Sequence, residues 1–230
     1  MNKKRSALSP RLERIDLDHI VDSEIDRLEP HESYDSERFT AFDLSDRDLT
    51  GTAFTECEFR DLSADNADFL AASFVDTRLD GLNSPRFQAP RSRLRNVEIN
   101  GSRLGSVEFY EARWQSVHLS DSKVSYINLR FAELTDVLFS DCIIDELDMR
   151  GAKANRVSFV NTTVNSLDFS ESKLQNVDLR TLELRRISGG AESLKGVTMT
   201  PYQASELAPV FAEYFGITLI EDEASGQRGR

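Results

Sequence analysis

Blocks of five residues repeat without interruption through most of this chain. Residues 106–130 read SVEFY EARWQ SVHLS DSKVS YINLR, and the fourth place of every block is apolar. Taken at each fifth residue over the range 39–199, this place gives 33 positions, of which 31 hold Ala or a larger apolar residue. The two exceptions are Ser84 and Gly189. Because helices repeat at 3.6 residues and strands at 2, the register indicates a chain that turns a corner every five residues.

The other places of the block describe how such a chain turns. The second place alternates between small and branched residues from Ser92 to Val177, so it should face inward as the fourth place does. The place two after the centre is rich in Gly, Asn and Asp, which favour turn conformations. Four blocks then close a square of 20 residues, and successive squares stack at the strand spacing of about 4.8 Å. The sequence therefore predicts an all-β solenoid of about eight coils, roughly 40 Å long, in which Phe139 lies over Phe159.

The repeat resembles that of the pentapeptide-repeat family, whose motif is A-(D/N)-L-x-x with Leu or Phe at the centre. The clearest matching blocks are Ala67-Asp68-Phe69, Val107-Glu108-Phe109, Ile127-Asn128-Leu129, Leu167-Asp168-Phe169 and Val177-Asp178-Leu179. The resemblance covers residues 39–199 and implies a right-handed quadrilateral β-helix. It also implies that activity resides in loops, caps and surface charge, because the repeats build a scaffold.

Residues 83–95, NSPRFQAPRSRLR, are the one poor stretch of the repeat. Ser84 and Ala89 occupy centres, and Pro85 and Pro90 each remove a backbone donor. The stretch has no acid, and its four bases are Arg86, Arg91, Arg93 and Arg95. Two interpretations stay open: a distorted coil or surface loop whose arginines pair with neighbouring carboxylates, or a contact loop for a partner.

Residues 1–38 lie outside the register. Apolar residues with helical spacing run from Leu17 to Leu28, and Pro30 ends the pattern. We interpret the segment as an N-terminal cap over the first coil, which a solenoid needs, with a loose stretch before Leu17. The basic start MNKKR has no apolar run behind it, so it is not interpreted as a secretory signal.

Residues 200–230 are expected to form a C-terminal module with a loose tail. Residues 201–215 predict a helix, since Thr200 can cap it, Pro201 suits its first position and Gly216 can end it. A short strand is expected at 217–220. The apolar stripe of the helix consists of Tyr202, Leu207, Val210, Phe211, Tyr214 and Phe215. This stripe either covers the last coil or joins two rods in a homodimer.

The C-terminal end resembles a narrower group, the Qnr-type quinolone-resistance proteins. The residues that carry this resemblance are Leu194-x-Gly196-Val197, Tyr202-Gln203-Ala204-Ser205-x-Leu207 and Gly216-Ile217. The resemblance implies a module that dimerises the rods end to end. It further implies action by likeness to DNA in shape and charge, so that DNA gyrase or topoisomerase IV binds the rod.

No catalytic group, cofactor or metal site is expected, and the chain is interpreted as a non-enzyme. Its histidines, His19, His31 and His118, are scattered. Cys57 and Cys142 fall at inward second places, where they are expected to be core residues rather than reactive thiols. No apolar run approaches the ~18 residues of a membrane span, so a cytoplasmic protein without a membrane partner is expected.

The charge of the chain limits the class of partner that it can bind. The net charge is −12, whereas a general nucleic-acid binder is normally basic, so direct nucleic-acid binding is not expected. B-DNA carries one charge per ~1.7 Å, so a mimic about 40 Å long needs about 24, whereas residues 39–199 carry a net −6. Residues 39–82 match the charge density of DNA more closely: they carry a net −7 over roughly 10 Å, where B-DNA carries about 6 negative charges. The acids expected to face the partner are Asp43, Asp48, Glu58 and Asp68, whereas the middle of the rod is interpreted as evenly charged.

Two functions stay open on these grounds. One is a DNA mimic that binds DNA gyrase or topoisomerase IV through its acidic first coils and the adjacent arginines. The other is a general protein-interaction scaffold with a different partner. Both are acidic, non-enzymatic, protein-binding rods.

Overall fold

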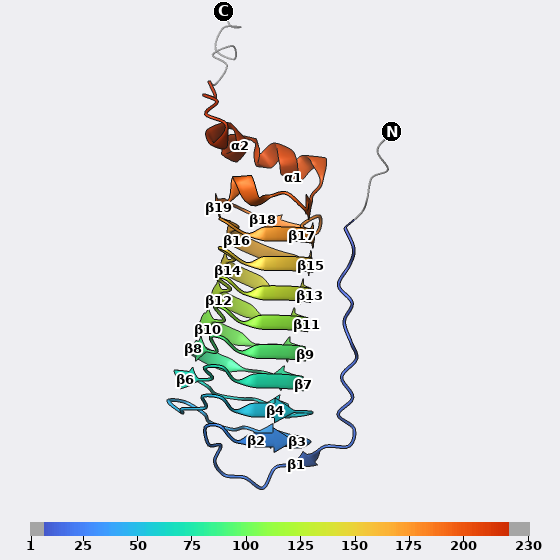
Figure 1. Cartoon of the computed structure of the whole chain (residues 1–230), viewed down its shortest axis with the longest axis vertical. Helices are drawn as coiled ribbons and strands as arrows, with labels where there is room; N and C mark the ends of the chain where they lie inside the picture. Colours follow the sequence, from blue (N-terminus) through green and yellow to red (C-terminus); the bar gives the residue numbers. More distant parts are fainter. Residues whose placement is uncertain (1–6, 221–230) are drawn as a thin grey trace, which may run out of the picture.

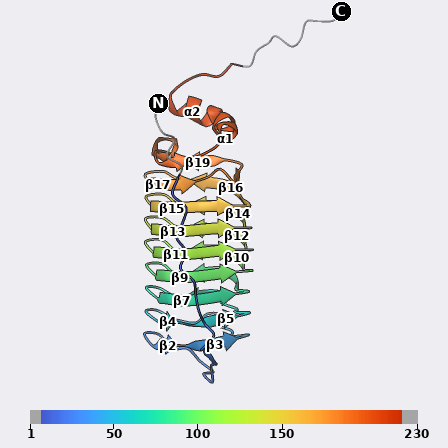
Figure 2. The same ribbon diagram turned by 90° about the vertical axis from the view of Figure 1, so that its right-hand side faces the viewer.

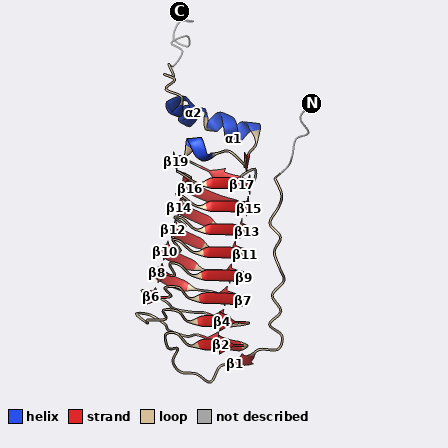
Figure 3. Cartoon of the chain, in the orientation of Figure 1, coloured by secondary structure: helices blue, strands red, loops and turns tan. Residues whose placement is uncertain are grey.

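Each five-residue block forms one side of a coil, and four blocks complete the coil. Strand partners therefore lie twenty residues apart, so that Phe139 is paired with Leu119 on one side and with Phe159 on the other. The computed structural model describes residues 7–220. Over this part of the chain, parallel pairing joins the strands into two sheets that run the length of a rod (Figures 1 and 3). The predicted β-solenoid is confirmed.

The two sheets each cover two adjacent sides of the rod. The first contains β1 (Val21–Asp22), β2 (Ser33–Asp35), β3 (Glu37–Thr40), β4 (Ala53–Thr55), β5 (Glu58–Arg60), β7 (Ser73–Asp80), β9 (Arg93–Asn100), β11 (Arg113–Ser120), β13 (Glu133–Ser140), β15 (Lys153–Val160), β17 (Lys173–Asp178) and β20 (Val197–Thr198). The second contains β6 (Ala67–Asp68), β8 (Asn83–Gln88), β10 (Arg103–Glu108), β12 (Lys123–Asn128), β14 (Ile143–Asp148), β16 (Thr162–Asp168), β18 (Leu182–Leu184) and β19 (Ile187–Gly189).

The fourth-place residues fill the interior of the rod. The rings of Phe139 and Phe159 stack with their centroids 5.0 Å apart and their planes 9° apart, as predicted. Cys57 and Cys142 are buried, and burial raises the pKa of each thiol to about 11. Both thiols are therefore core residues in their protonated form, as the sequence indicated.

The corners fall where the sequence placed them. Positive φ angles occur at 21 non-glycine residues of the described chain, and every one has a number ending in 1 or 6, two after a centre. From β8 to β16 one corner is built differently, because the strands of the second sheet run straight through it. Its residues keep negative φ, which explains why Arg86 and Tyr126 occupy it in place of Gly, Asn or Asp.

The coils begin earlier than the register indicated. Strand β2 pairs with β4, and Tyr34 is buried with its ring stacked 5.5 Å from that of Phe54. Leu28 is also buried in the core, and Ile25 packs against it. The turn that precedes β2 therefore closes the first coil.

Residues 83–95 form a regular coil rather than a surface loop. Ser84 is fully buried and its Oγ donates a hydrogen bond of 2.7 Å to the carbonyl of Ala64, so a hydroxyl replaces an apolar centre without an unpaired donor. In the coil above, Gly105 faces Pro85, where a Cβ would lie 2.1 Å from the proline carbonyl oxygen. The glycine lets the coil follow the proline closely, and the loop interpretation is wrong.

The N-terminal segment is extended, so the helix indicated by the spacing from Leu17 to Leu28 is wrong. Residues 7–20, which we call the strap, run along the outside of the rod across the strands of the first sheet (Figure 2). Residues 7–16, expected to be loose, thus lie along the rod. Ile15, Leu17 and Ile20 are buried and form a small apolar cluster of their own.

Side chains at one corner of the rod hold the strap. The backbone N–H of Arg11 donates to Asp136 Oδ1 at 2.8 Å, and that of Glu13 donates to Ser116 Oγ at 2.8 Å. These two acceptors lie one coil apart on the same corner. The strap is therefore bound through its backbone by outward side chains of successive coils.

Two short helices replace the single predicted C-terminal helix. Helix α1 (Pro201–Glu206) begins with a capping box in which Thr200 Oγ1 accepts from the N–H of Gln203, and α2 (Ala208–Tyr214) follows. They separate at Leu207, because Pro209 has no N–H to continue the helix. A 3₁₀ turn, η1 (Ala191–Ser193), precedes them, and the strand expected at 217–220 is absent from the described structure. The expected loose tail from residue 221 and the basic start MNKKR lie outside the described residues.

Candidate partner-binding surfaces

Six aspartates gather on two adjacent sides of the first coils. We call them the acidic patch: Asp43, Asp46, Asp48, Asp61, Asp65 and Asp68. Asp43 lies beside Ser63 and Asp48 beside Asp68, as neighbouring rungs of the coil stack. The first three and Asp61 are exposed. The sequence named three of the six, and the others occupy outward places of the same blocks.

Local hydrogen bonds favour the ionised form of two patch carboxylates, Asp43 and Asp48. Asp43 Oδ1 accepts from the N–H of Ser45 at 3.0 Å, and Asp48 Oδ1 accepts from that of Thr50 at 3.0 Å. The Ser45 side chain and backbone lower the pKa of Asp43, and the Thr50 backbone and side chain lower that of Asp48. One oxygen of each carboxylate is thereby fixed, and the other can accept from a cationic partner.

Glu58 does not belong to this surface, although the sequence placed it there. Its side chain is 3% exposed, and it accepts from Arg38 Nε at 2.6 Å and from Arg60 Nη2 at 2.9 Å. Strap residues Leu17 and Asp18 line the same cavity of 380 Å³. Burial opposes ionisation, but the arginine hydrogen bonds outweigh it and keep the pKa of Glu58 below its ordinary value. The outward place was predicted correctly, whereas the covering strap was not.

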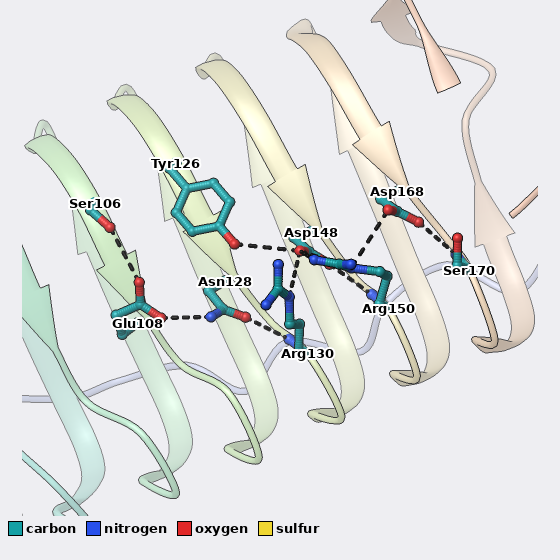
Figure 4. Close-up of polar contacts among 9 residues, drawn as sticks. All are labelled: Ser106, Glu108, Tyr126, Asn128, Arg130, Asp148, Arg150, Asp168 and Ser170. Carbon is teal, nitrogen blue, oxygen red and sulfur yellow. Dashed lines mark hydrogen bonds and ion pairs between the residues drawn. The ribbon is translucent and has the colours of Figure 1, made fainter. Parts of the chain in front are cut away.

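A column of acids and amides continues from the patch up the rod. Its members lie twenty residues apart: Asp48, Asp68, Gln88, Glu108, Asn128, Asp148 and Asp168. Figure 4 shows the upper part of this column, in which the charges are largely compensated. Asn128 Nδ2 donates to Glu108 Oε2 at 2.6 Å, and Arg130 Nε donates to Asp148 Oδ2 at 2.6 Å.

Arginines make the difference between the two ends of the column. Arg150 Nη2 also donates to Asp148 Oδ2, at 2.8 Å. Burial raises the pKa of Asp148, and Arg130 offsets part of that effect. Two residues after Asp48 and Asp68 stand Thr50 and Leu70, where the coils of Asn128 and Asp148 have Arg130 and Arg150. Arginines therefore compensate Asp148, whereas Glu108 is paired with the amide of Asn128, and Asp48 and Asp68 in the patch have neither partner within residues 7–220.

The arginines of 83–95 border the patch and mostly pair with carboxylates. Arg91 Nε lies 2.7 Å from Glu111 Oε2, and Arg86 Nε lies 3.7 Å from Asp65 Oδ1. Arg95 reaches Asp76 at 3.7 Å. The pairing interpretation thus describes these three side chains, whereas Arg93 is exposed on the same side of the rod as Arg95.

The C-terminal helices have a buried side and an exposed apolar side. Leu207, expected at a dimer interface, is buried over the last coil, and Gln203 Nε2 donates to the carbonyls of Leu179 and Leu182 at 2.5 and 3.0 Å. Val210 and Phe211 are half-buried. The exposed apolar surface consists of Tyr202, Tyr214, Phe215, Ile217, Leu219 and Ile220. The helices therefore cap the rod and still present apolar side chains outward.

Residues 7–220 contain no group of three or more His, Cys, Asp or Glu side chains placed to hold a metal ion. The same part of the chain has no helix of the length and hydropathy needed to cross a membrane. His118 is half-buried with Nε2 2.7 Å from Ser140 Oγ, and burial lowers its pKa.

Solved structures that match this chain include those of QnrB1 and HetL. Trypsin-treated QnrB1, a plasmid-mediated fluoroquinolone resistance protein, is 19% identical over 84% of this chain and 93% of its own, with a TM-score of 0.26. HetL, a pentapeptide-repeat protein involved in heterocyst differentiation regulation in the cyanobacterium Nostoc, is 14% identical over 72% and 90%, with a TM-score of 0.27. Full-length QnrB1 is 18% identical over 82% and 92%, with a TM-score of 0.21.

No protein-family model matches the chain, and none of the curated proteins matches it. Similarity this distant bears on the fold at most, and the strand pairing of the chain itself establishes the fold. The five-residue coils confirm the expected resemblance to pentapeptide-repeat proteins.

Proposed function

We propose that this chain is a non-enzymatic, cytoplasmic protein-binding rod whose acidic patch takes the place of DNA on a DNA-binding protein. The observation that carries the proposal is the concentration of six carboxylates on two adjacent sides of the first coils, of which only Asp65 forms a salt bridge within the described residues. The repeats fix the spacing of these carboxylates, and local hydrogen bonds favour the ionised form of Asp43 and Asp48. The rest of the rod serves as a rigid support.

Charge density supports this proposal over part of the rod only. Residues 39–82 carry a net −7 over roughly 10 Å, where B-DNA carries about 6 charges. Higher in the same column, arginines compensate Asp148. A partner that binds a short stretch of DNA backbone fits this distribution better than one that follows a long duplex.

DNA gyrase and topoisomerase IV are the first partners to examine. The reason is the resemblance of the C-terminal end to Qnr-type proteins, carried by Tyr202–Ser205 and by Gly216 and Ile217. The exposed apolar surface beside these residues fits the homodimer that this resemblance implies. A general scaffold with another protein partner is the alternative, and it requires only the repeat.

A charge-neutral variant of the patch tests the proposal. Asp43→Asn, Asp46→Asn, Asp48→Asn and Asp68→Asn together remove four charges and keep the amide oxygen as an acceptor for the local hydrogen bonds. We expect inhibition of gyrase supercoiling to weaken at least about tenfold, since each exposed pair contributes up to ~1 kcal/mol.

The matched control removes four exposed acids elsewhere on the rod. It combines Asp121→Asn, Asp141→Asn, Asp145→Asn and Glu146→Gln, so its net charge equals that of the patch variant. We expect less than a twofold change. Equal losses would show that total charge matters and the patch does not, and a wild-type protein without effect on gyrase would leave the scaffold alternative.

A further inference from the structure

The middle coils are not evenly charged, which corrects the interpretation from the sequence. The first residues of β9, β11, β13, β15 and β17 stack in register as one column up a side of the first sheet. They are Arg93, Arg113, Glu133, Lys153 and Lys173. Four bases and one acid thus face outward on a single side of the rod.

This column forms one wall of a groove. Two adjoining hollows of 550 and 480 Å³ lie on this side, and both are lined by Glu133 and Thr135. The second wall is a column two residues further along each strand: Arg95, Gln115, Thr135, Asn155 and Gln175. The groove crosses five strands, which is about 19 Å at the usual strand spacing. We call it the basic groove.

The positive charge of the basic groove is only partly compensated. Glu133 is its single acid and is shared, with Lys153 Nζ at 2.9 Å and Arg113 Nε at 3.5 Å. The side chains of Arg113 and Lys153 are 66% and 62% exposed. Arg95 on the second wall lies 3.7 Å from Asp76, so five bases meet two acids and the groove still carries a surplus of positive charge on a molecule of net charge −12.

The strap shows how the rod binds an extended chain along its axis. It lies on the corner that adjoins the second wall, and its backbone donates to Asp136 and Ser116, the residues that follow Thr135 and Gln115. In four of its five coils, the groove presents an amide or hydroxyl side chain at the same height: Gln115, Thr135, Asn155 and Gln175. These groups both donate and accept, so they can satisfy the N–H and C=O groups of a second extended chain.

We propose that the basic groove binds an extended acidic segment of a partner protein, whose carboxylates meet Arg93, Arg113, Lys153 and Lys173 while its backbone meets the amide wall. A polypeptide fits better than a nucleic acid, because phosphates and sugars make little use of acceptor groups in the amide wall. The net negative charge of the rod also repels a nucleic acid at long range. This surface is separate from the acidic patch and does not depend on the function proposed above.

Fluorescence anisotropy with defined probes tests the groove. The probes are a labelled twelve-residue peptide of alternating Glu and Thr, the same peptide with Gln for Glu, and a labelled twelve-nucleotide oligo-dT. The groove variant combines Arg93→Gln, Arg113→Gln, Lys153→Gln and Lys173→Gln in the full chain. The control combines Arg103→Gln, Lys123→Gln, Arg185→Gln and Lys195→Gln, exposed bases outside the groove with the same total charge change.

We expect the Glu peptide to bind the wild-type protein, the groove variant to bind it about tenfold more weakly, and the control to differ by less than twofold. Binding should weaken between 0.1 M and 1 M salt as the Debye length falls from ~10 Å to ~3 Å. Equal losses in both variants, equal binding of the Gln peptide, or no binding at about 1 mM protein would overturn the proposal. Tighter binding of oligo-dT would replace it with a nucleic-acid site.

Discussion

Whether an outward carboxylate stays exposed or becomes part of an ion pair depends on the side chains beside it on its own coil and on the neighbouring coil. Asp48 and Asp148 occupy the same column, in which only the coils of Asn128 and Asp148 have an arginine two residues further on. Thr50 lowers the pKa of Asp48 through its backbone and leaves the carboxylate exposed, whereas burial raises that of Asp148 between two arginines. The same residue type at the same place in the repeat thus serves as surface charge in one coil and as structural ion pair in another.

Glu58→Gln should lower the free energy of unfolding by about 2 kcal/mol at pH 7, because hydrogen bonds from charged donors contribute about 1.5–3 kcal/mol. Arg38 and Arg60 lose a charged acceptor that lies 2.6 and 2.9 Å away. Glu111→Gln is the control, since its pair with Arg91 is half-exposed and should contribute less than ~1 kcal/mol. Urea unfolding measures both, and equal losses would contradict the buried role of Glu58.

The contribution of Glu58 to the free energy of unfolding should also depend on pH. Its pKa is lower in the folded protein than the ordinary value of 4.5, so its stabilisation is present above pH 4.5 and is lost as pH falls through the lowered pKa. The difference in unfolding free energy between wild type and Glu58→Gln should therefore shrink below about pH 4.5. A difference that stays constant down to pH 3 would mean that the carboxylate is not the stabilising group.

Two phenylalanines, one in the core and one on a corner, should differ in the stability that is lost on replacement by alanine. Phe139 is fully buried against Phe159, so Phe139→Ala should cost ~3–5 kcal/mol. Phe131 sits on a corner with a φ of 56° and a 60% exposed ring, so Phe131→Ala should cost under ~1 kcal/mol. Similar costs in thermal or urea unfolding would mean that the five-residue register is assigned to the wrong side of the chain.

At this scale the sequence predicted the inward places and the corners but misjudged Glu58. The repeat tells which side of the backbone a residue occupies, because the fourth and second places alternate with outward ones. It does not tell what lies over that side. Glu58 is buried by the strap and by arginines of neighbouring coils, a contact between segments about forty residues apart that no local pattern encodes.

Among the elements, the strap departs most from its sequence pattern. The apolar residues from Leu17 to Leu28 fit a helical spacing, yet the segment is extended. Ile15 and Leu17 also fit the alternation of a strand, and the outward side chains of the coils supply acceptors such as Asp136 Oδ1 for its backbone. Hydrogen bonds to a corner that is distant in sequence therefore favour the extended conformation over the helix, although the local sequence fits both.

Leu17→Asp should release the strap from the rod, because a carboxylate would replace a buried side chain of its apolar cluster. Arg11 and Arg14 are exposed within the strap, so trypsin should then cut after them at least about tenfold faster, as local opening becomes easier. Asp16→Asn, on the exposed side, is the control and should leave the rate within about twofold. Mass spectrometry of timed digests gives the rates; a rod that is cut throughout would show global unfolding instead.

The C-terminal helices illustrate what could and could not be predicted. Thr200 and Pro201 start a helix as the sequence indicated, and the capping box forms. Pro209 was contained in the predicted helix, and its missing N–H divides that helix in two. Leu207 then lies at the break and is buried over the last coil, so it belongs to the cap and not to the exposed apolar surface.

For the whole molecule, two surfaces of opposite charge result from a repeat that looks uniform. The acidic patch occupies the first coils, and the basic groove runs along another side from β9 to β17. The net charge of each sequence segment does not reveal the groove, because acids on other sides of the same coils cancel the charge of its bases. The twenty-residue recurrence that the sequence predicts would have revealed it if applied to the outward places, since Arg93, Arg113, Lys153 and Lys173 share one column.

The exposed apolar surface at the C-terminal end predicts a homodimer of whole rods. Tyr214 and Phe215 are 52% and 69% exposed, and Ile217 beside them is 57% exposed. Light scattering should give twice the chain mass at micromolar concentration, and Tyr214→Ser with Phe215→Ser should give a monomer, because apolar burial at the interface is lost. Phe131→Ser, a change of an exposed ring elsewhere, should leave the dimer intact. A monomeric wild-type protein would contradict the dimer.

Competition with DNA for gyrase tests the central claim most directly. A labelled DNA duplex bound to gyrase is titrated with the wild-type rod and, separately, with the variant that carries Asp43→Asn, Asp46→Asn, Asp48→Asn and Asp68→Asn. If the acidic patch replaces DNA on the enzyme, the wild-type rod displaces the duplex, more weakly as salt rises, and the variant displaces it at least about tenfold less well. Displacement by both proteins at equal concentrations, or a ternary complex in which gyrase holds rod and duplex together, would contradict the claim.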